Sequence, residues 1–175
     1  MLLEECVPPV PDITKDEALA RLARNYFRSH TPATLQDFVW WSGLSVTEAK
    51  QGIYLIGCEL TEEQWKGQTW YLHESGRTRG SIKGHIRFLP PYDELLLGYK
   101  DRTDALPSEH CSKAFTGNGL FFPVILYEGQ IVGNWDRKVK RNGCDPGYSL
   151  FRQESRIDEA LLDKAQQQYM QFLGK

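Results

Sequence analysis

The sequence has no long apolar run, no closely spaced cysteines and no excess of one charge sign, and each absence excludes a class of protein. No apolar run approaches the roughly 20 residues that a helix needs to cross a bilayer. The apolar run at the N-terminus is too short for a signal peptide, and Glu4 and Glu5 are unsuited to one. We therefore expect neither a membrane span nor a secreted protein.

Cysteine is scarce and scattered. Four cysteines occur, and no two of them form a C-x-x-C pair: Cys6, Cys58, Cys111 and Cys144. Isolated cysteines in a chain without a secretion signal indicate reduced thiols and a cytoplasmic protein. A zinc site needs ligands at close, regular spacing. The sequence therefore predicts no metal, and nothing in it indicates a cofactor.

The charge is nearly balanced, with 21 basic and 23 acidic residues and a net charge of −2, so no global field draws the protein to DNA. The distribution is uneven, however. Two segments each carry a net charge of +3, from four basic residues and one acidic residue: the glycine-rich residues 73–87 and residues 135–142. These local concentrations of positive charge bear more on the choice of partner than the net charge does.

Three helix starts can be read directly from the first third of the chain. Each is a capping box, in which a hydroxyl and an acidic side chain three residues later satisfy the first free amides of a helix. The three boxes are Thr14 with Glu17, Thr34 with Asp37, and Ser45 with Glu48. Ser42-Gly43 ends the second helix, because glycine suits the left-handed cap position. The order is therefore helix, helix, tight turn, helix.

Two strands follow, Leu60 to Trp65 and Thr69 to Leu72, around a hairpin tip at Lys66-Gly67-Gln68. Three helices and a two-stranded ribbon are typical of a winged helix. Further on, two apolar strands turn at Glu128-Gly129-Gln130, and residues 147–153 add a third strand. A closing amphipathic helix is indicated by an apolar stripe: Ile157, Leu161, Ala165, Tyr169 and Phe172.

The predicted fold class is α+β, a winged helix followed by a small antiparallel sheet or partial β-barrel with a C-terminal helix. We predict four segments. Residues 1–13 form a lead-in that contains Pro8, Pro9 and Pro11, and residues 14–73 form the winged-helix domain. Residues 74–87 form a basic glycine-rich loop, and residues 88–175 form the antiparallel β domain with its helix.

Three stretches in this order resemble the AlkZ-like family of winged-helix DNA-binding proteins, which includes bacterial DNA glycosylases. They are LARNYFRSHTPATLQDFVWWSGLSVTEAK, RFLPPYDELLLGYKDR and ILYEGQIVGNW. The resemblance runs from about residue 15 onward. It implies a function in DNA repair, with double-stranded DNA as the partner. Members of the family are about twice this length and enclose duplex DNA with tandem winged helices and a C-terminal β-barrel.

The resemblance also implies where catalysis takes place. The family's catalytic motif, Gln-apolar-Gln or Gln-apolar-Asp, lies in the N-terminal half, and this chain resembles the C-terminal portion. Gln166-Gln167-Gln168 is no substitute, since its middle residue is polar and it lies on the final helix. We therefore predict no catalytic residue and expect a missing N-terminal winged-helix half as a second partner.

Candidate DNA contacts come from three places. In a helix-turn-helix the N-terminal residues of the second helix meet base edges, and the hairpin tip of a wing can reach a phosphate. The basic segments can neutralise phosphates, each with a salt-dependent gain in affinity. The candidates are Ser45, Thr47, Lys50, Gln51, Lys66, Arg77, Arg79, Lys83, Arg87, Arg137, Lys138, Lys140 and Arg141. For each of them the alternative is an ordinary solvated surface or packing against a neighbouring domain.

Other candidates for base stacking or catalysis have simpler explanations. Trp40 and Trp41 could stack on bases, but core packing explains them better. His73, His85, Asp93 and Glu94 show no spacing of nucleophile, base and orienting group, and a helix-capping role suits Asp93. Three functions stay open: a DNA-binding module, a glycosylase that uses other residues, and a winged helix that binds proteins.

Overall fold

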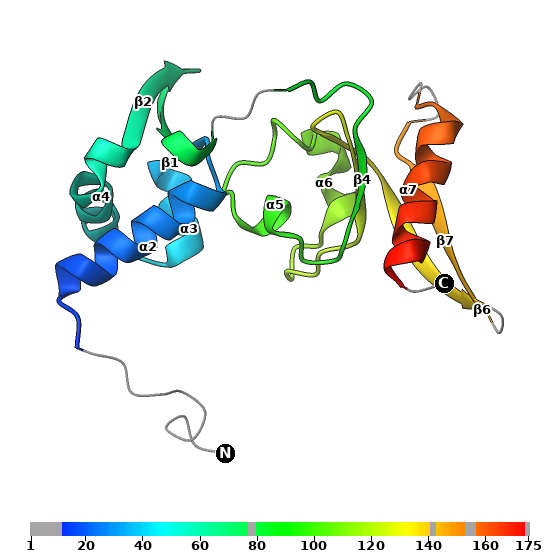
Figure 1. The fold of residues 1–175 in the computed structure, drawn as a ribbon, viewed down its shortest axis with the longest axis horizontal. Helices are drawn as coiled ribbons and strands as arrows, with labels where there is room; N and C mark the ends of the chain where they lie inside the picture. The colour runs from blue at the N-terminus through cyan, green and yellow to red at the C-terminus, as the bar shows by residue number, and fades with distance from the viewer. Residues whose placement is uncertain (1–11, 77–79, 141–142, 153–156, 174–175) are drawn as a thin grey trace, which may run out of the picture. The chain divides into compact units, whose positions relative to one another are not determined.

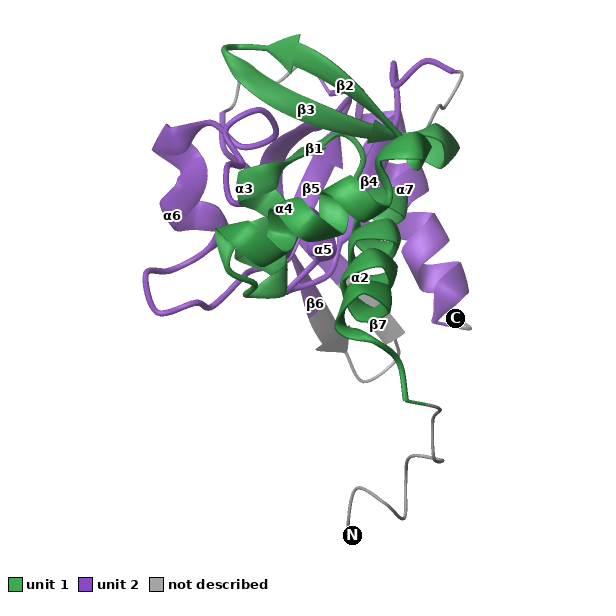
Figure 2. Ribbon diagram, turned by 90° about the vertical axis from the view of Figure 1, so that its left-hand side faces the viewer, with its two compact units in different colours: residues 1–78 green, residues 79–175 purple. Residues whose placement is uncertain are grey.

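The computed structural model describes residues 12–76, 80–140, 143–152 and 157–173. The chain forms two compact units, residues 1–78 and 79–175, which Figure 2 shows in green and purple. Each unit combines helices with one antiparallel sheet, so the expected mixed α and β class is confirmed. Pro8, Pro9 and Pro11 of the predicted lead-in lie outside the described residues. Among the described helices, none combines the length and the apolar character that a membrane crossing requires.

Three helices dominate the first unit: α2 (Lys15–Ser29), α3 (Leu35–Ser42) and α4 (Val46–Leu55) (Figure 1). All three predicted capping boxes are present, with both the hydroxyl and the acidic side chain bonded to backbone amides. Gly43 caps α3 in the left-handed region at φ 70°, as the sequence predicts. The structure therefore confirms the starts of all three helices.

The sheet of this unit contains β1 (Ala33–Thr34), β2 (Leu60–Trp65) and β3 (Gln68–His73) in the order β1-β3-β2. The 3-10 turn η1 (Gly57–Glu59) leads into β2, and η2 (Glu74–Gly76) follows β3. The hairpin turns at Lys66 and Gly67, both with positive φ. Positive φ at both central residues is the geometry that matches the twist of the flanking strands.

An aromatic core joins the helices to this sheet. Tyr26 and Phe27 of α2 and Phe38 of α3 are fully buried, and their rings lie 5.1–5.4 Å apart. Helix α4 approaches α2 closely at Gly52, where an added Cβ would lie 3.1 Å from the carbonyl oxygen of Leu19. Close approach of α4 buries one face of this helix and fixes which face remains exposed.

The second unit contains a four-stranded antiparallel sheet in the order β4-β5-β6-β7. Its strands are β4 (Ile86–Leu89), β5 (Val124–Tyr127), β6 (Gln130–Lys140) and β7 (Gly143–Leu150). The predicted turn between β5 and β6 has positive φ at Glu128 and Gly129. Of the two predicted forms, an antiparallel sheet or a partial barrel, the strand order is that of the sheet.

Short helices and one long helix complete this unit. Two short α-helices and a 3-10 turn lie between β4 and β5: α5 (Glu94–Leu97), η3 (Ser108–His110) and α6 (Cys111–Ala114). Asp93 caps α5 by accepting from the Leu95 amide at 2.9 Å, as predicted. Helix α7 (Glu159–Phe172) packs on the sheet, burying Leu162 and Ala165 against Ile86, Ile125 and Trp135.

Two expectations for apolar side chains were wrong. Trp40 and Trp41 were expected in the core, but they are 55 % and 37 % exposed. The eight residues of α3 turn Phe38 inward, which leaves Trp40 and Trp41 at the margin of the core. The Trp41 ring packs there against Tyr26, with ring centroids 5.0 Å apart, and against His30. Phe172, the last member of the predicted stripe, is 84 % exposed because α7 ends there.

Candidate nucleic-acid interface

Helix α4 has one buried face and one exposed face. Ala49, Gly52 and Ile53 are buried, whereas Thr47, Lys50 and Gln51 are exposed. Residues three and four apart share a helix face, so these three predicted contact residues form one polar surface. The sheet of this unit does not cover that surface, so its polar groups are exposed.

The N-terminus of α4 is held by a network centred on the Glu48 carboxylate. This carboxylate accepts from the Ser45 hydroxyl at 2.7 Å and from the Lys15 ammonium of α2 at 2.8 Å. The Lys15 bond, followed by those from Ser45, lowers the pKa of Glu48 to about 2. Glu48 is the acidic group that would repel a phosphate at this end. The Lys15 charge offsets it, so the amide end of α4 remains suited to an anion.

Tyr54 extends the exposed face of α4 but was not predicted. It is 79 % exposed and lies one helical turn beyond Lys50 and Gln51. The signal for it in the sequence is this spacing alone, because an isolated tyrosine at the end of a short helix does not otherwise differ from a core residue. Val46, at the first position of the helix, is also exposed, at 45 %.

The tip of the β2–β3 hairpin carries one cation next to an aromatic pair. The Lys66 ammonium lies 4.1 Å from the centroid of the Trp65 ring, and Trp65 packs edge-on against Trp70. Glu62 and Glu63 are exposed on the same strand as Trp65. Lys66 is therefore accessible at the tip, but it lies close in sequence to two carboxylates that oppose phosphate binding.

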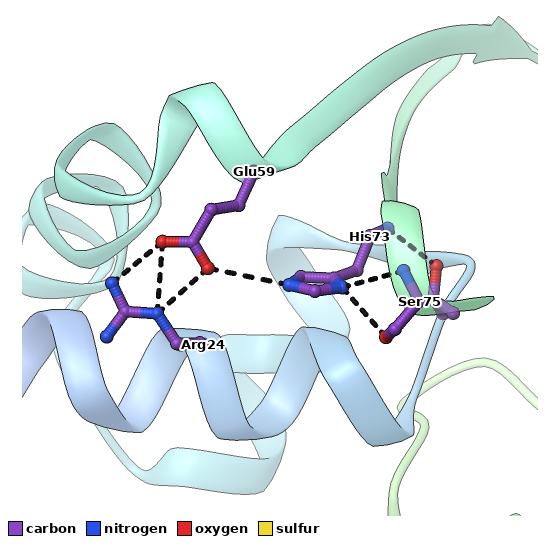
Figure 3. A network of polar contacts seen from close by, with 5 residues as sticks. Arg24, Glu59, His73 and Ser75 are labelled. Carbon is purple, nitrogen blue, oxygen red and sulfur yellow. Dashed lines mark hydrogen bonds and ion pairs between the residues drawn. The ribbon is translucent and has the colours of Figure 1, made fainter. Parts of the chain in front are cut away.

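A polar network fixes the far end of this hairpin (Figure 3). Arg24 of α2 donates to both carboxylate oxygens of Glu59, from Nε at 2.8 Å and from Nη2 at 2.7 Å. This paired bond holds the pKa of the Glu59 carboxyl below its usual value. The same carboxylate lies 3.5 Å from Nε2 of His73, a buried residue at the end of β3. The network thus joins α2, η1 and β3.

Ser75 completes an arrangement that sequence reasoning missed. Its hydroxyl lies 2.8 Å from Nδ1 of His73, and its backbone amide donates to the same nitrogen at 3.1 Å. The order Ser75, His73, Glu59 is that of a nucleophile, a base and an orienting acid. However, Nδ1 has one in-plane lone pair, and the Ser75 backbone amide already donates to it. We therefore assign the network a positioning role, in which it closes the turn after β3 against α2.

The predicted contacts in the two basic segments, residues 73–87 and 135–142, are only partly described. Lys83, Arg87 and Arg137 are exposed. Arg77, Arg79 and Arg141 lie outside the described residues, and of Lys138 and Lys140 only the backbone, within β6, is described. Beyond Asn134, β6 pairs with β7 alone, so residues 136–140 and 143–147 form a two-stranded arm with Arg137 on it. The Gln166 side chain of α7 supports this arm by donating to the Pro146 carbonyl at 2.6 Å.

The predicted contacts thus fall into two groups. Ser45, Thr47, Lys50, Gln51 and Lys66 belong to the first unit, and the remaining described cations belong to the second. Within the described ranges, no group of three or more His, Cys, Asp or Glu side chains could hold a metal ion.

Known proteins with a similar sequence or fold agree with this architecture. The chain matches the family model of AlkZ-like DNA glycosylases over residues 2–172. It is 28 % identical over 128 residues to an interstrand DNA cross-link repair glycosylase of Streptomyces sahachiroi, a match that covers 69 % of this chain and 34 % of that protein. The chain therefore spans about a third of the length of that curated relative.

A solved structure gives the same result for the fold. The DNA glycosylase AlkZ of Streptomyces sahachiroi superposes with a TM-score of 0.72 over 89 % of this chain and 43 % of its own length. At 24 % identity this likeness shows the fold alone. The family match covers nearly the whole sequence, both units included. The chain belongs to the family of AlkZ-like DNA glycosylases.

Proposed function

We propose that the chain is a DNA-binding module of a DNA-repair glycosylase, and that its first unit is a winged helix. The order of its elements supports this proposal: helix, short strand, two helices, then a hairpin that pairs back onto the short strand. In a winged helix the third of these helices is the recognition helix, and here it is α4. The hairpin of β2 and β3 is then the wing.

The exposed polar face of α4 is the observation that carries the proposal. Thr47, Lys50 and Gln51 present a hydroxyl, an ammonium and an amide on one face, and these are groups that meet base edges and phosphates. The opposite face of the helix is buried, so the position of these groups is fixed before any ligand binds. Prior fixation lowers the entropic cost of binding.

The second unit contributes phosphate contacts in this proposal. In it, backbone charge is neutralised by the predicted cations Lys83, Arg87, Arg137, Lys138, Lys140 and Arg141. Such contacts position the duplex without reading its sequence. The arm is narrow because it is two-stranded, a shape that fits beside a phosphate backbone.

The curated relative is named as an interstrand DNA cross-link repair glycosylase, and glycosylase activity requires a separate test in this chain. No Gln-apolar-Gln or Gln-apolar-Asp tripeptide occurs in the 175 residues. We therefore propose that these residues bind DNA but do not themselves release a base. Incubation with alkylated or cross-linked duplex, followed by chromatography of the supernatant, tests this, and free base above the protein-free level would overturn it.

DNA binding is tested by the anisotropy of a fluorescein-labelled duplex over a salt series. We expect affinity to fall linearly on a double-logarithmic plot against salt concentration, with a slope of about −0.9 for each phosphate neutralised. Lys50→Gln should weaken binding, whereas Lys113→Gln, which removes an exposed cation remote in sequence from the predicted contacts, should not. Absence of binding at low salt would overturn the proposal.

A further inference from the structure

A cavity of about 220 Å³ lies within the second unit, between strand β4 and helix α7. Strand β4 is at the edge of the sheet, and α7 packs beside it (Figure 1). The cavity is smaller than the roughly 300–1,000 Å³ of typical small-molecule sites. Its lining residues are Gly84, His85, Ile86, Arg87, Leu161, Lys164, Ala165 and Gln168.

The fold explains why this space stays open. Leu161, Lys164, Ala165 and Gln168 follow the spacing of one helix face, and Ala165 is buried against Ile86 in the core. Alanine on the helix and Gly84 before the strand have the shortest side chains in the lining. Larger side chains there would bring their atoms into the space, so these small residues leave it open.

The lining is basic. Arg87 and Lys164 each carry a positive charge, His85 adds an imidazole, and none of the eight lining residues is acidic. His85, Arg87 and Lys164 are exposed. Neither Arg87 nor Lys164 forms an ion pair with another described residue. Glu128 lies nearby, but its carboxylate accepts from the Gly84 amide at 2.7 Å. Asp163 precedes Lys164 on α7 and is exposed.

The donors are also held in place. Nη1 of Arg87 donates to the Ile86 carbonyl at 2.8 Å, which fixes the guanidinium and leaves its other N–H groups available. The His85 carbonyl accepts from the Glu128 amide and therefore faces β5. In an antiparallel pair the backbone groups of successive residues face opposite sides, so those of Ile86 face away from β5. The backbone N–H of Ile86 therefore points to the open edge of the sheet.

We propose that this cavity binds a phosphate group, through Arg87, Lys164 and the amide of Gln168, with a ring N–H of His85 as a further donor. A planar guanidinium and an ammonium on opposite walls match the oxygens of a tetrahedral dianion or of a phosphodiester. The volume fits one phosphate group and not a whole nucleotide. The phosphate belongs either to the DNA backbone or to a free phosphate ester.

The proposal does not depend on DNA binding by α4, because the cavity lies wholly within the second unit. The experiment uses the whole chain, labelled with nitrogen-15, and follows the backbone amide signals in NMR spectra. The three probes are inorganic phosphate, dimethyl phosphate and a short duplex. We expect inorganic phosphate to shift the amides of residues 84–87 and 161–168 in a saturable manner.

Variants make the test specific to the cavity. Arg87→Gln and Lys164→Gln should each weaken phosphate binding by about tenfold, the loss expected for one charge-assisted hydrogen bond. Lys113→Gln removes one positive charge of the same unit outside the cavity and should leave binding unchanged. Amide spectra that retain the wild-type dispersion show that each variant folds. Ala165→Leu, which fills the cavity without changing charge, should also abolish the shifts.

The outcomes separate the two sources of the phosphate. If dimethyl phosphate and the duplex shift the same amides, the ligand is the DNA backbone. If inorganic phosphate alone does so, the ligand is a free phosphate monoester, and the cavity proposal holds even where DNA binding fails. Shifts scattered over exposed lysines of both units, or shifts that survive in Arg87→Gln and Lys164→Gln, would overturn the proposal.

Discussion

Gly52 sets the distance between α2 and α4, and so determines the position of α4 and of its exposed face. A Cβ at this position would lie 3.1 Å from the Leu19 carbonyl oxygen and 3.3 Å from the Ala23 side chain. Both neighbours belong to the same rigid helix. Neither can move aside as the end of a flexible side chain would, so the two helices would have to separate.

We therefore expect Gly52→Val to destabilise the protein. Overpacking costs about 1–3 kcal/mol, which exceeds the roughly 0.4 kcal/mol that valine gains over glycine in helix propensity. Urea denaturation followed by circular dichroism measures the change in the free energy of unfolding. Gly57→Val is the matched control, since an added Cβ there meets nothing within 4 Å. Equal stability of the two variants would contradict the packing argument.

Glu48 predicts a dependence of stability on pH. Its pKa is lowered from 4.5 to about 2 in the folded protein, first through the bond from Lys15 and then through those from Ser45. A lowered folded pKa means that the carboxylate stabilises the fold above its ordinary pKa. That contribution is lost as the pH falls through the folded value.

Glu48→Gln should accordingly be less stable than the wild type near neutral pH and equally stable near pH 2. The difference should shrink between about pH 5 and pH 2, the window set by the ordinary and the lowered pKa. Thermal denaturation at a series of pH values measures it. A difference that does not vary with pH would show that the glutamine removes only packing and not the charged interaction.

Contacts between residues close in sequence could be predicted, whereas contacts between distant residues could not. The capping boxes were predictable because each is made by residues three apart, and all three are present. The Arg24–Glu59 pair joins residues 35 apart, and its contact depends on how η1 docks on α2. No local pattern encodes that docking, so the surroundings of His73 could not be predicted.

Because helix α4 is short, its cap, its buried face and its exposed face lie close together. Sequence reasoning identified its start and the polar residues of its first turns. It did not identify Tyr54, because the end of a short helix is the least certain part of a periodic pattern. The same uncertainty explains Phe172, which continues the apolar period of α7 beyond the point where the sheet covers it.

Tyr54→Ser tests whether the exposed face of α4 contacts DNA as a whole. Loss of one neutral hydrogen bond or its equivalent contact should weaken binding by about two- to tenfold. The midpoint of urea denaturation should hardly change, since the side chain is 79 % exposed. Phe172→Ser, at an exposed aromatic residue in the other unit, is the control. A similar loss of affinity in both variants would mean that the effect is not specific to α4.

For the molecule as a whole, charge placement matters more than total charge. The net charge is −2, yet candidate cations occur in both units, Lys50 and Lys66 in the first and Arg87 and Arg137 in the second. Sequence reasoning located these residues, because local charge density is visible in one dimension. The predicted segments placed Lys50 and Lys66 in residues 14–73 and Arg137 in residues 88–175, but they assigned Arg87 to a separate loop, residues 74–87.

If both units contact one duplex, their contributions to the salt dependence of binding add. Lys50→Gln and Arg137→Gln should each reduce the slope of log affinity against log salt by about 0.9, and the double variant by about 1.8. The side chains belong to different units and share no partner, so no coupling is expected. Anisotropy titrations at four salt concentrations measure the slopes. A double variant no different from Lys50→Gln would mean that Arg137 does not contact the DNA, and that the first unit binds the duplex without help from the arm.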